Sequence, residues 1–248
     1  MSVYVIADLH LSTLDTTNKS MEVFGHRWQN YIARLKTAWE HLVTEEDTVI
    51  IPGDVSWALS LDESLSDMRF IDALPGRKIL GKGNHDFWWS TMAKHRAFFE
   101  KHAISSIDFL FNNAYAVEDF IIAGTRGWYQ DESCSNIPSG TDYVKLVNRE
   151  CQRLELSLKE AERLQGEHPD SEIVAFFHFP PYYNGKACPE LIEVLRAQGI
   201  KRVYYGHIHG DYAVPHTVSY EGLDFTLISA DYLEFTPKHI PKSTNIAE

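Results

Sequence analysis

The chain has 248 residues, and its 23 lysines and arginines against 35 aspartates and glutamates give a formal net charge of −12. Hydrophobic residues make up 44% of the chain, which is enough to fill a packed core and excludes a disordered protein. The acidic balance argues against a long nucleic acid or an anionic membrane as a partner, because both attract basic surfaces.

The first hundred residues alternate apolar runs with amphipathic stretches. Three short apolar runs predict buried strands, at residues 3–7, 49–51 and 78–80. Three stretches with apolar residues at helical spacing predict helices, over about 27–44, 60–72 and 90–101. This alternation with short links predicts an α/β fold, in which helices pack on a mixed or parallel sheet.

The pattern then changes to closely spaced strands over 104–129, followed by a long helix over 142–166. Two apolar runs and a helix between them come next, at 173–177, 203–205 and near 189–198. The last forty residues return to strands and end in a polar tail at about 237–248, which we expect to be mobile. Because no repeat and no linker is visible, residues 1–248 are expected to form a single domain.

Cysteine usage and the start of the chain bear on the cellular compartment. The three cysteines are odd in number and form no Cys-x-x-Cys pair, so neither a disulfide framework nor a zinc–thiolate site is suggested. The first residues lack the basic segment of a signal peptide, and no uncharged apolar stretch approaches roughly 18 residues. We therefore expect a soluble cytoplasmic protein without a membrane span.

Five polar segments directly follow predicted strands. They are Asp8-Leu9-His10, Gly53-Asp54, Gly83-Asn84-His85-Asp86, His178 and Gly206-His207-Ile208-His209. Loops at the carboxyl ends of strands converge on one crevice in open α/β sheets, so these segments are expected to meet. The i, i+2 spacing of the first and last segments would place both side chains of each on one face of an extended backbone.

Each segment alone also has an ordinary explanation, since Gly-Asp is a common turn and a lone histidine is often a packed core residue. Five coincidences in five strand-end positions are much less expected than one shared metal centre. Aspartate, asparagine and histidine without cysteine suit Mn, Fe, Zn, Co or Ni. One ion takes three or four protein ligands. The seven candidates therefore favour two divalent ions, and they are Asp8, His10, Asp54, Asn84, His178, His207 and His209.

The ordered set of five motifs resembles the calcineurin-like metallophosphoesterases, over residues 8–209. This resemblance implies a four-layer β-sandwich flanked by helices. It also implies two ligand groups that share Asp54 as a bridge. One ion would be held by Asp8, His10, Asp54 and His209, and the other by Asp54, Asn84, His178 and His207.

One position departs from part of that family. Members of the protein-phosphatase type continue Gly-Asp-x-x-Asp-Arg, and their second aspartate orients the histidine of Gly-Asn-His. This chain has Gly53-Asp54-Val55-Ser56-Trp57 at that place, so Trp57 stands where the orienting carboxylate would be. The departure argues against a protein phosphatase.

The resemblance implies an enzyme, a metal-dependent phosphoric ester hydrolase. We expect it to cleave small phosphomonoesters or phosphodiesters by attack of a metal-bridging hydroxide, because two cations make hydroxide available at neutral pH. By analogy, His85 is the catalytic residue that protonates the leaving oxygen or stabilises the phosphoryl charge. Two alternatives stay open: a nuclease of the same superfamily, and a metal-binding interaction scaffold without catalysis.

Three residues are candidate substrate contacts. Trp57 and Tyr182 could line an aromatic pocket that stacks a base or a phenolic group, or they could simply pack in the core. Arg126 follows an apolar run and could clamp a phosphate with two hydrogen bonds, or it could be an ordinary surface arginine.

Overall fold

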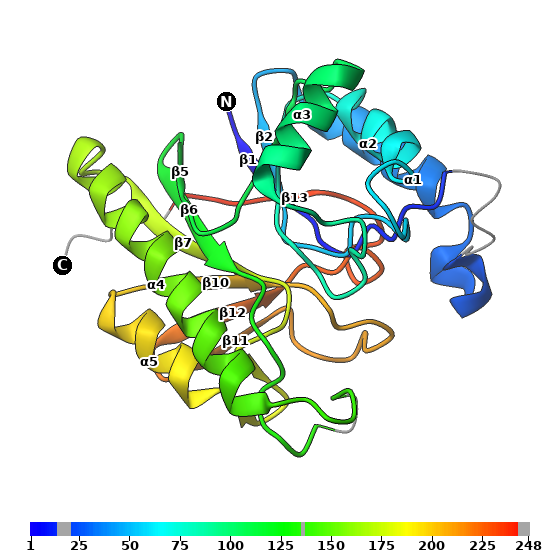
Figure 1. The fold of residues 1–248 in the computed structure, drawn as a ribbon. Coiled ribbons are helices and arrows are strands. Elements are labelled where there is room, and N and C mark those ends of the chain that lie inside the picture. The colour runs from blue at the N-terminus through cyan, green and yellow to red at the C-terminus, as the bar shows by residue number, and fades with distance from the viewer. Residues whose placement is uncertain (14–20, 135–136, 243–248) are drawn as a thin grey trace.

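Two β-sheets lie face to face, with helices on both outer sides (Figure 1). The computed structural model describes residues 1–13, 21–134 and 137–242. The four-layer α/β sandwich that the sequence predicts is confirmed. Among the described residues, no helix has both the length and the apolar composition needed to cross a lipid bilayer.

The first sheet has five strands in the order β13-β1-β2-β3-β4. Four of them run parallel, and these are β1 (Val3–Val5), β2 (Thr48–Ile51), β3 (Arg77–Leu80) and β4 (Ile107–Phe109). At the edge, β13 (Lys238–His239) pairs antiparallel to β1. Three helices cover the outer face, α1 (Tyr31–Leu42), α2 (Leu65–Asp72) and α3 (Met92–His102). Two short 3-10 helices precede them, η1 (Met21–Phe24) and η2 (His26–Trp28).

The second sheet has six strands in the order β11-β12-β10-β7-β6-β5. Its four central strands are parallel, β12 (Leu223–Leu227), β10 (Arg202–Tyr205), β7 (Glu172–Phe177) and β6 (Phe120–Thr125). Its edges are antiparallel, β11 (Thr217–Tyr220) and β5 (Tyr115–Val117). The outer face carries α4 (Tyr143–Glu167) and α5 (Pro189–Ala197), and a hairpin, β8 (Tyr182–Tyr183) with β9 (Lys186–Ala187), lies between β7 and α5 in the chain.

Successive side chains of each strand point to opposite faces of the sheet, so the continuous apolar runs contribute to three separate cores. In β2, Val49 and Ile51 face the helices, while Ile50 faces the other sheet. In β7, Val174 and Phe176 fill the space between the sheets, and their neighbours face α4 and α5. Because both faces of these parallel strands are covered, the runs contain no polar residue until the strand ends.

The helices begin where capping chemistry allows, and this shifts some predicted boundaries. The helix expected from residue 27 begins only at Tyr31, because Asn30 before it has a left-handed backbone with φ of 51°. Thr91 accepts a hydrogen bond from the backbone of Lys94 at the start of α3, and Asp142 caps α4 in the same way.

The prediction of a mobile polar tail from residue 237 is wrong for its first part. Lys238 and His239 form β13, and the Ile240 side chain is buried between the sheets. The Ile240 backbone N–H donates to the carbonyl of Val3, 2.8 Å away. An apolar side chain among polar neighbours thus anchors this segment, and residues 243–248 lie outside the described residues.

Candidate metal centre

The five segments that follow strands meet at one place. They leave the carboxyl ends of β1, β2 and β3 in the first sheet and of β7 and β10 in the second. Parallel strands in each sheet end on the same side, so their loops converge where the two sheets adjoin. The structure brings together all seven side chains that the sequence singles out: Asp8, His10, Asp54, Asn84, His178, His207 and His209.

Asp8 and His10 form one side of the cluster. The Nε2 atom of His209 lies 3.4 Å from Asp8 Oδ1 and 3.1 Å from His10 Nε2. Oxygen and nitrogen atoms of Asp8, His10 and His209 all lie within 4.8 Å of one another, which is compatible with a single ion.

Asp54 and Asn84 form the other side. The Oδ2 atom of Asp54 lies between two imidazoles, 3.6 Å from His10 Nε2 and 3.4 Å from His178 Nε2. The amide oxygen of Asn84 is 2.7 Å from His178 Nε2 and 2.9 Å from His207 Nδ1. Asp8, Asp54 and His178 make a second group with the spacing of a metal site, so Asp8 is common to both groups.

The hydrogen bonds around His209 show that these donors fit a cation. Its Nδ1–H donates to the Asp231 carboxylate at 2.9 Å, which leaves a lone pair on Nε2. That lone pair faces Asp8 Oδ1, also an acceptor. Only a proton or a metal cation relieves the repulsion, and Asp8 and Asp231 accordingly raise the pKa of His209 to about 10, although burial alone would lower it.

The other ring nitrogens are set up as neutral ligands. Burial and neighbouring histidines hold the pKa of both His10 and His178 well below its usual value. Burial likewise lowers the pKa of His207 to about 4. The pKa of Asp54 is raised well above its usual value by burial and then by Asp86 and Asp8, so these crowded carboxylates also favour a cation nearby.

The backbone at these ligands is left-handed, with φ of 60° at Asp8, 45° at His10, 50° at Asp54 and 70° at His207. The prediction that extended backbone aligns the i, i+2 pairs is therefore wrong at Asp8, His10 and His207. A sharp reversal directly after the strand turns the side chains inward instead. Such conformations cost free energy for residues other than glycine and persist where surrounding contacts enforce them.

Two glycines let the ligand loops approach closely. A Cβ atom added at Gly83 would lie 2.0 Å from Asp54 Oδ1, and one added at Gly206 would lie 2.4 Å from Asp8 Oδ2. Neither carboxylate can move aside, because both are buried and hydrogen-bonded. Glycine is needed at these positions for the space it leaves.

Asp86 is a buried residue of the third segment that the sequence did not assign. Its carboxylate accepts backbone hydrogen bonds from Asp54 at 2.9 Å and Gly83 at 2.7 Å, as well as the indole N–H of Trp88 at 2.9 Å. Val55 and Ser56 donate their backbone N–H groups to the same carboxylate. A single side chain thus fixes the loops after β2 and β3 relative to each other.

Asp231 and Ser229 follow β12 and were also missed. Ser229 Oγ donates to Asp8 Oδ2 at 2.8 Å, and Asp231 accepts from His209, from the backbone of Gly210 and from the Tyr212 hydroxyl. Both lie just beyond the end of a parallel strand, the same signal that identified the other segments, so the strand-end rule applied to β12 would have found them.

His85 and Trp57 adjoin the ligands. The His85 backbone donates to Asp54 Oδ1 at 2.7 Å, and its half-buried ring lies 5.6 Å from the His10 ring. Trp57 stacks on His10 with ring centroids 4.9 Å apart and lies 4.4 Å from the His85 ring. An indole thus packs against His85 where protein phosphatases would have a carboxylate.

The other two candidate substrate contacts lie in different places. The Arg126 carbonyl accepts the backbone N–H groups of His178 and Phe179, which places this residue beside a ligand. Tyr182 stacks face to face on Tyr220, with centroids 4.2 Å apart, an arrangement typical of packing.

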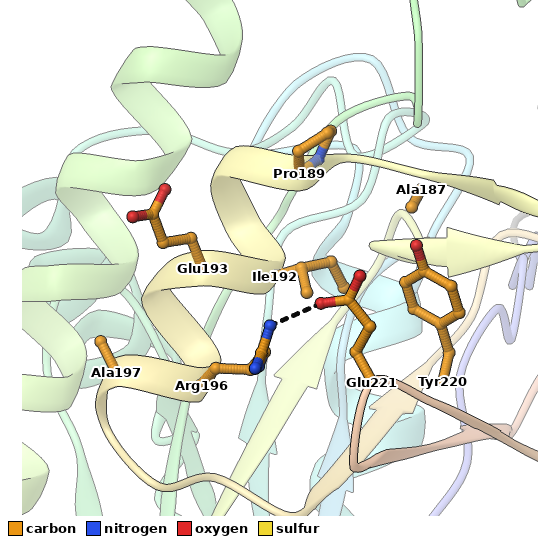
Figure 2. Close-up of a pocket in the computed structure, with 8 residues that line it drawn as sticks. All are labelled: Ala187, Pro189, Ile192, Glu193, Arg196, Ala197, Tyr220 and Glu221. Carbon is orange, nitrogen blue, oxygen red and sulfur yellow. Dashed lines mark hydrogen bonds and ion pairs between the residues drawn. The ribbon is translucent and has the colours of Figure 1, made fainter.

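Tyr220 also lines a surface pocket of about 610 Å³, shown in Figure 2. This pocket lies along α5 and the turn between β11 and β12, and an Arg196–Glu221 ion pair crosses it. The turn precedes β12, whereas the metal centre lies beyond the other end of the parallel strand β10. The pocket is therefore separate from the candidate centre.

Comparison with known proteins agrees with this geometry. The family model described as calcineurin-like phosphoesterase matches residues 1–211. The phosphopantetheinyl hydrolase of Mycobacterium tuberculosis has a similar fold, with a TM-score of 0.53, 15% identity, and coverage of 100% of this chain and 98% of that one. The protein TT1561 of Thermus thermophilus gives a TM-score of 0.51 at 11% identity, over 93% and 89%. No curated protein sequence matches the chain.

Proposed function

The chain belongs to the calcineurin-like phosphoesterase family, a family of hydrolases, and on that basis we propose that it hydrolyses small phosphomonoesters or phosphodiesters with two divalent cations. The observation that carries the proposal is the convergence of seven oxygen and nitrogen donors from five strand ends, with acceptor atoms facing one another. Such pairs of ions, when bound, neutralise charge on phosphoryl oxygens and make water nucleophilic at neutral pH.

We assign one ion to Asp8, His10, Asp54 and His209 and the other to Asp54, Asn84, His178 and His207. The position of Asp54 Oδ2 between His10 and His178 supports its role as the shared ligand. The absence of cysteine from this set favours Mn, Fe, Zn, Co or Ni.

His85 is proposed as the catalytic residue. Its backbone hydrogen bond to Asp54 fixes it next to the ligands, and its ring is half-buried and open to a substrate. Packing against Trp57 limits the rotation of the ring. From this place the imidazole donates a proton to the leaving oxygen or stabilises charge on the phosphoryl group.

Two observations disfavour the alternatives. A nuclease for long substrates needs a basic groove, and the net charge of −12 opposes it, although a small diester remains compatible. A scaffold that had lost catalysis would tolerate substitutions among the ligands, whereas all seven positions carry side chains that bind metal.

The proposal is tested by metal analysis of the purified protein together with a screen of p-nitrophenyl monoesters and diesters. We expect about two divalent ions per chain and turnover that a chelator abolishes and Mn²⁺ restores. A protein that binds metal but turns over no ester with added Mn²⁺ would support the scaffold.

If His85 is catalytic and not a metal ligand, replacing it should lower the rate of hydrolysis without loss of metal. His85→Ala should lower kcat about 10²–10⁴-fold, the usual contribution of a general acid, while both ions stay bound. His41→Ala, an exposed histidine on α1, is the matched control and should retain activity. Loss of metal from His85→Ala at an unchanged rate per bound metal pair would contradict the role.

A further inference from the structure

Three basic side chains line a narrow crevice beside the metal centre. They are Lys82, Arg126 and Arg153, and we call this group the cationic crevice. Lys82 comes from the loop after β3, Arg126 from the end of β6 and Arg153 from α4. The crevice therefore lies where the first sheet, the second sheet and the long helix meet.

The cationic crevice adjoins the metal ligands directly. Lys82 precedes Asn84 by two residues in the same loop. The Arg126 carbonyl accepts the backbone N–H of His178, 3.2 Å away. Lys82 lies in a loop that carries a candidate ligand, and Arg126 is hydrogen-bonded to another. A substrate only a few bonds long could therefore reach both the metal centre and the cationic crevice.

The local charge is net positive in a chain whose overall charge is negative. The carboxylate of Glu150, which has no solvent exposure, lies 2.8 Å from Arg153 Nη1, 3.6 Å from Arg149 Nε and 3.9 Å from Arg126 Nη2. It also accepts the Thr125 hydroxyl at 2.7 Å. Lys82 is a fourth cation of this region, and the charged groups that act on it are Arg126, Arg153, Glu150 and Asp86. Four cations thus stand against two carboxylates.

Arg126 is held in place with hydrogen-bonding capacity to spare. Its guanidinium lies over the Trp128 ring, 4.8 Å from the centroid, and its side chain is only 15% exposed. Within the described part of the chain, the buried Nε atom makes no hydrogen bond. A fixed guanidinium of this kind suits a phosphate, because little side-chain entropy is lost on binding.

We propose that the cationic crevice binds a second phosphate group of the substrate, carried on the part of the molecule away from the ester that is cleaved. This inference rests on the proposed function and narrows its substrate class to small bisphosphorylated compounds. The enclosed space is about 10 Å³, the size of one water-sized sphere, so the phosphate would lie at the mouth of the crevice. There it would meet the ends of Lys82 and Arg153 and the exposed part of the Arg126 side chain.

The test uses the metal-loaded protein and a series of α,ω-alkanediol bisphosphates of increasing length, each compared with its alkyl monophosphate as an inhibitor of p-nitrophenyl phosphate hydrolysis. The best-fitting bisphosphate should bind at least about tenfold more tightly than its monophosphate, as expected for charge-assisted hydrogen bonds. Lys82→Gln should bring this ratio close to one. No length that improves on its monophosphate would overturn the proposal.

Lys82→Gln is the first choice because it leaves Glu150 paired, whereas Arg153→Gln removes an ion-pair partner and could unsettle α4. Arg163→Gln is the matched control, since this arginine lies on the same helix and pairs with Glu160 and Glu167 at the surface. It should keep the wild-type ratio. An equal fall of the bisphosphate-to-monophosphate affinity ratio in Lys82→Gln and Arg163→Gln would mean a general charge effect and would overturn the proposal.

Calorimetry with inorganic phosphate separates this inference from the proposed function. The metal-loaded protein should bind two phosphates, and Lys82→Gln should lose one of them. If no ester is hydrolysed but Lys82→Gln still weakens phosphate binding, the proposed function fails and the anion site stands. If esters are hydrolysed and Lys82→Gln binds phosphate like the wild type, the proposed function stands and the anion site is excluded.

Discussion

The two sheets supply different kinds of ligand to the candidate metal centre and hold them by different means. The first sheet contributes both carboxylates, and one buried side chain, Asp86, ties its second and third ligand loops together. The second sheet contributes three histidines that are held by separate partners. Asp231, which follows β12 of the same sheet, holds His209, and Asn84 of the first sheet lies against His178 and His207. The ligand loops of the first sheet therefore depend on one shared side chain, and the histidines of the second sheet depend on separate contacts.

This difference implies that removing a supporting carboxylate has different effects in the two sheets. Removing Asp86 leaves four backbone N–H groups and the Trp88 indole without their acceptor, in two loops at once. Removing Asp231 affects the His209 ring, the adjacent Gly210 N–H and the Tyr212 hydroxyl, all in one loop. Four substitutions or conditions test the contrast, in order of decreasing expected effect.

Asp54→Ala should abolish activity and metal binding together. Asp54 lies between His10 and His178, so its loss affects both proposed ions, and the remaining turnover should fall to background. The measurement is metal content per chain alongside hydrolysis of p-nitrophenyl phosphate. His207→Ala in the second half should remove only one ion. An active Asp54→Ala protein with two bound ions would show that Asp54 is not shared.

Asp86→Asn should destabilise the fold by about 3–5 kcal/mol. The NH₂ group of the asparagine would face backbone N–H groups that the buried carboxylate of Asp86 now accepts. Urea unfolding of the metal-free protein measures this without interference from bound ions. Asp62→Asn at an exposed position of the same half is the control and should change little. A stable Asp86→Asn protein would remove the distinction between the two halves.

Asp231→Asn should weaken metal binding about 10–100-fold while the fold stays intact, the usual cost of losing a partner behind a ligand histidine. Competition with a chelating dye measures the affinity of the weaker ion. Asp224→Asn, at an exposed position on β12, should leave it unchanged. If Asp231→Asn instead unfolds the protein as strongly as Asp86→Asn, the second sheet depends on one side chain as the first sheet depends on Asp86.

Mild acid should loosen the first half through His95, a fully buried residue of α3 outside the metal centre. Burial lowers the pKa of its imidazole from 6.5 to about 4, so the ring is neutral in the fold but takes up a proton in the unfolded chain below pH 6.5. Stability attributable to His95 is complete above pH 6.5 and falls as the pH drops toward 4, by about 1 kcal/mol at pH 5.5.

His95→Gln offers an acceptor for the Ser90 N–H that the imidazole accepts at 3.0 Å, but it does not titrate. The difference in free energy of unfolding between wild type and this variant, measured in urea, should therefore change by about 1 kcal/mol between pH 7 and pH 5.5. An unchanged difference would show that His95 is protonated in the native protein.

Sequence patterns were sufficient for the α/β class and for the convergence of the candidate ligands, because both follow from apolar strands that end in polar residues. The continuous runs at 49–51 and 173–177 require cover on both faces, whereas the four-layer sandwich was expected only from the resemblance to a known family. Their strand ends then predict which side chains converge.

The sequence did not predict the backbone conformation at the candidate ligands. It also did not predict which residues, distant in sequence, hydrogen-bond to them. The left-handed conformation of Asp8 and His10 is set by contacts to Gly53 and Asp54 in the next loop, and short-range patterns do not contain such contacts. Asp231 acts 22 residues after its partner His209, and Ile240 is buried only because β1 leaves an edge for β13.

The pairing of β13 with β1 has a consequence for synthesis on the ribosome. β1 is made long before its partner β13, so β1 has an open edge until β13 is synthesised. Asp8 likewise lacks its Ser229 partner for most of that time. A chain that stalls before β12 would expose an unpaired strand edge beside a half-built ligand cluster, which makes translation pauses late in this sequence a point of aggregation risk.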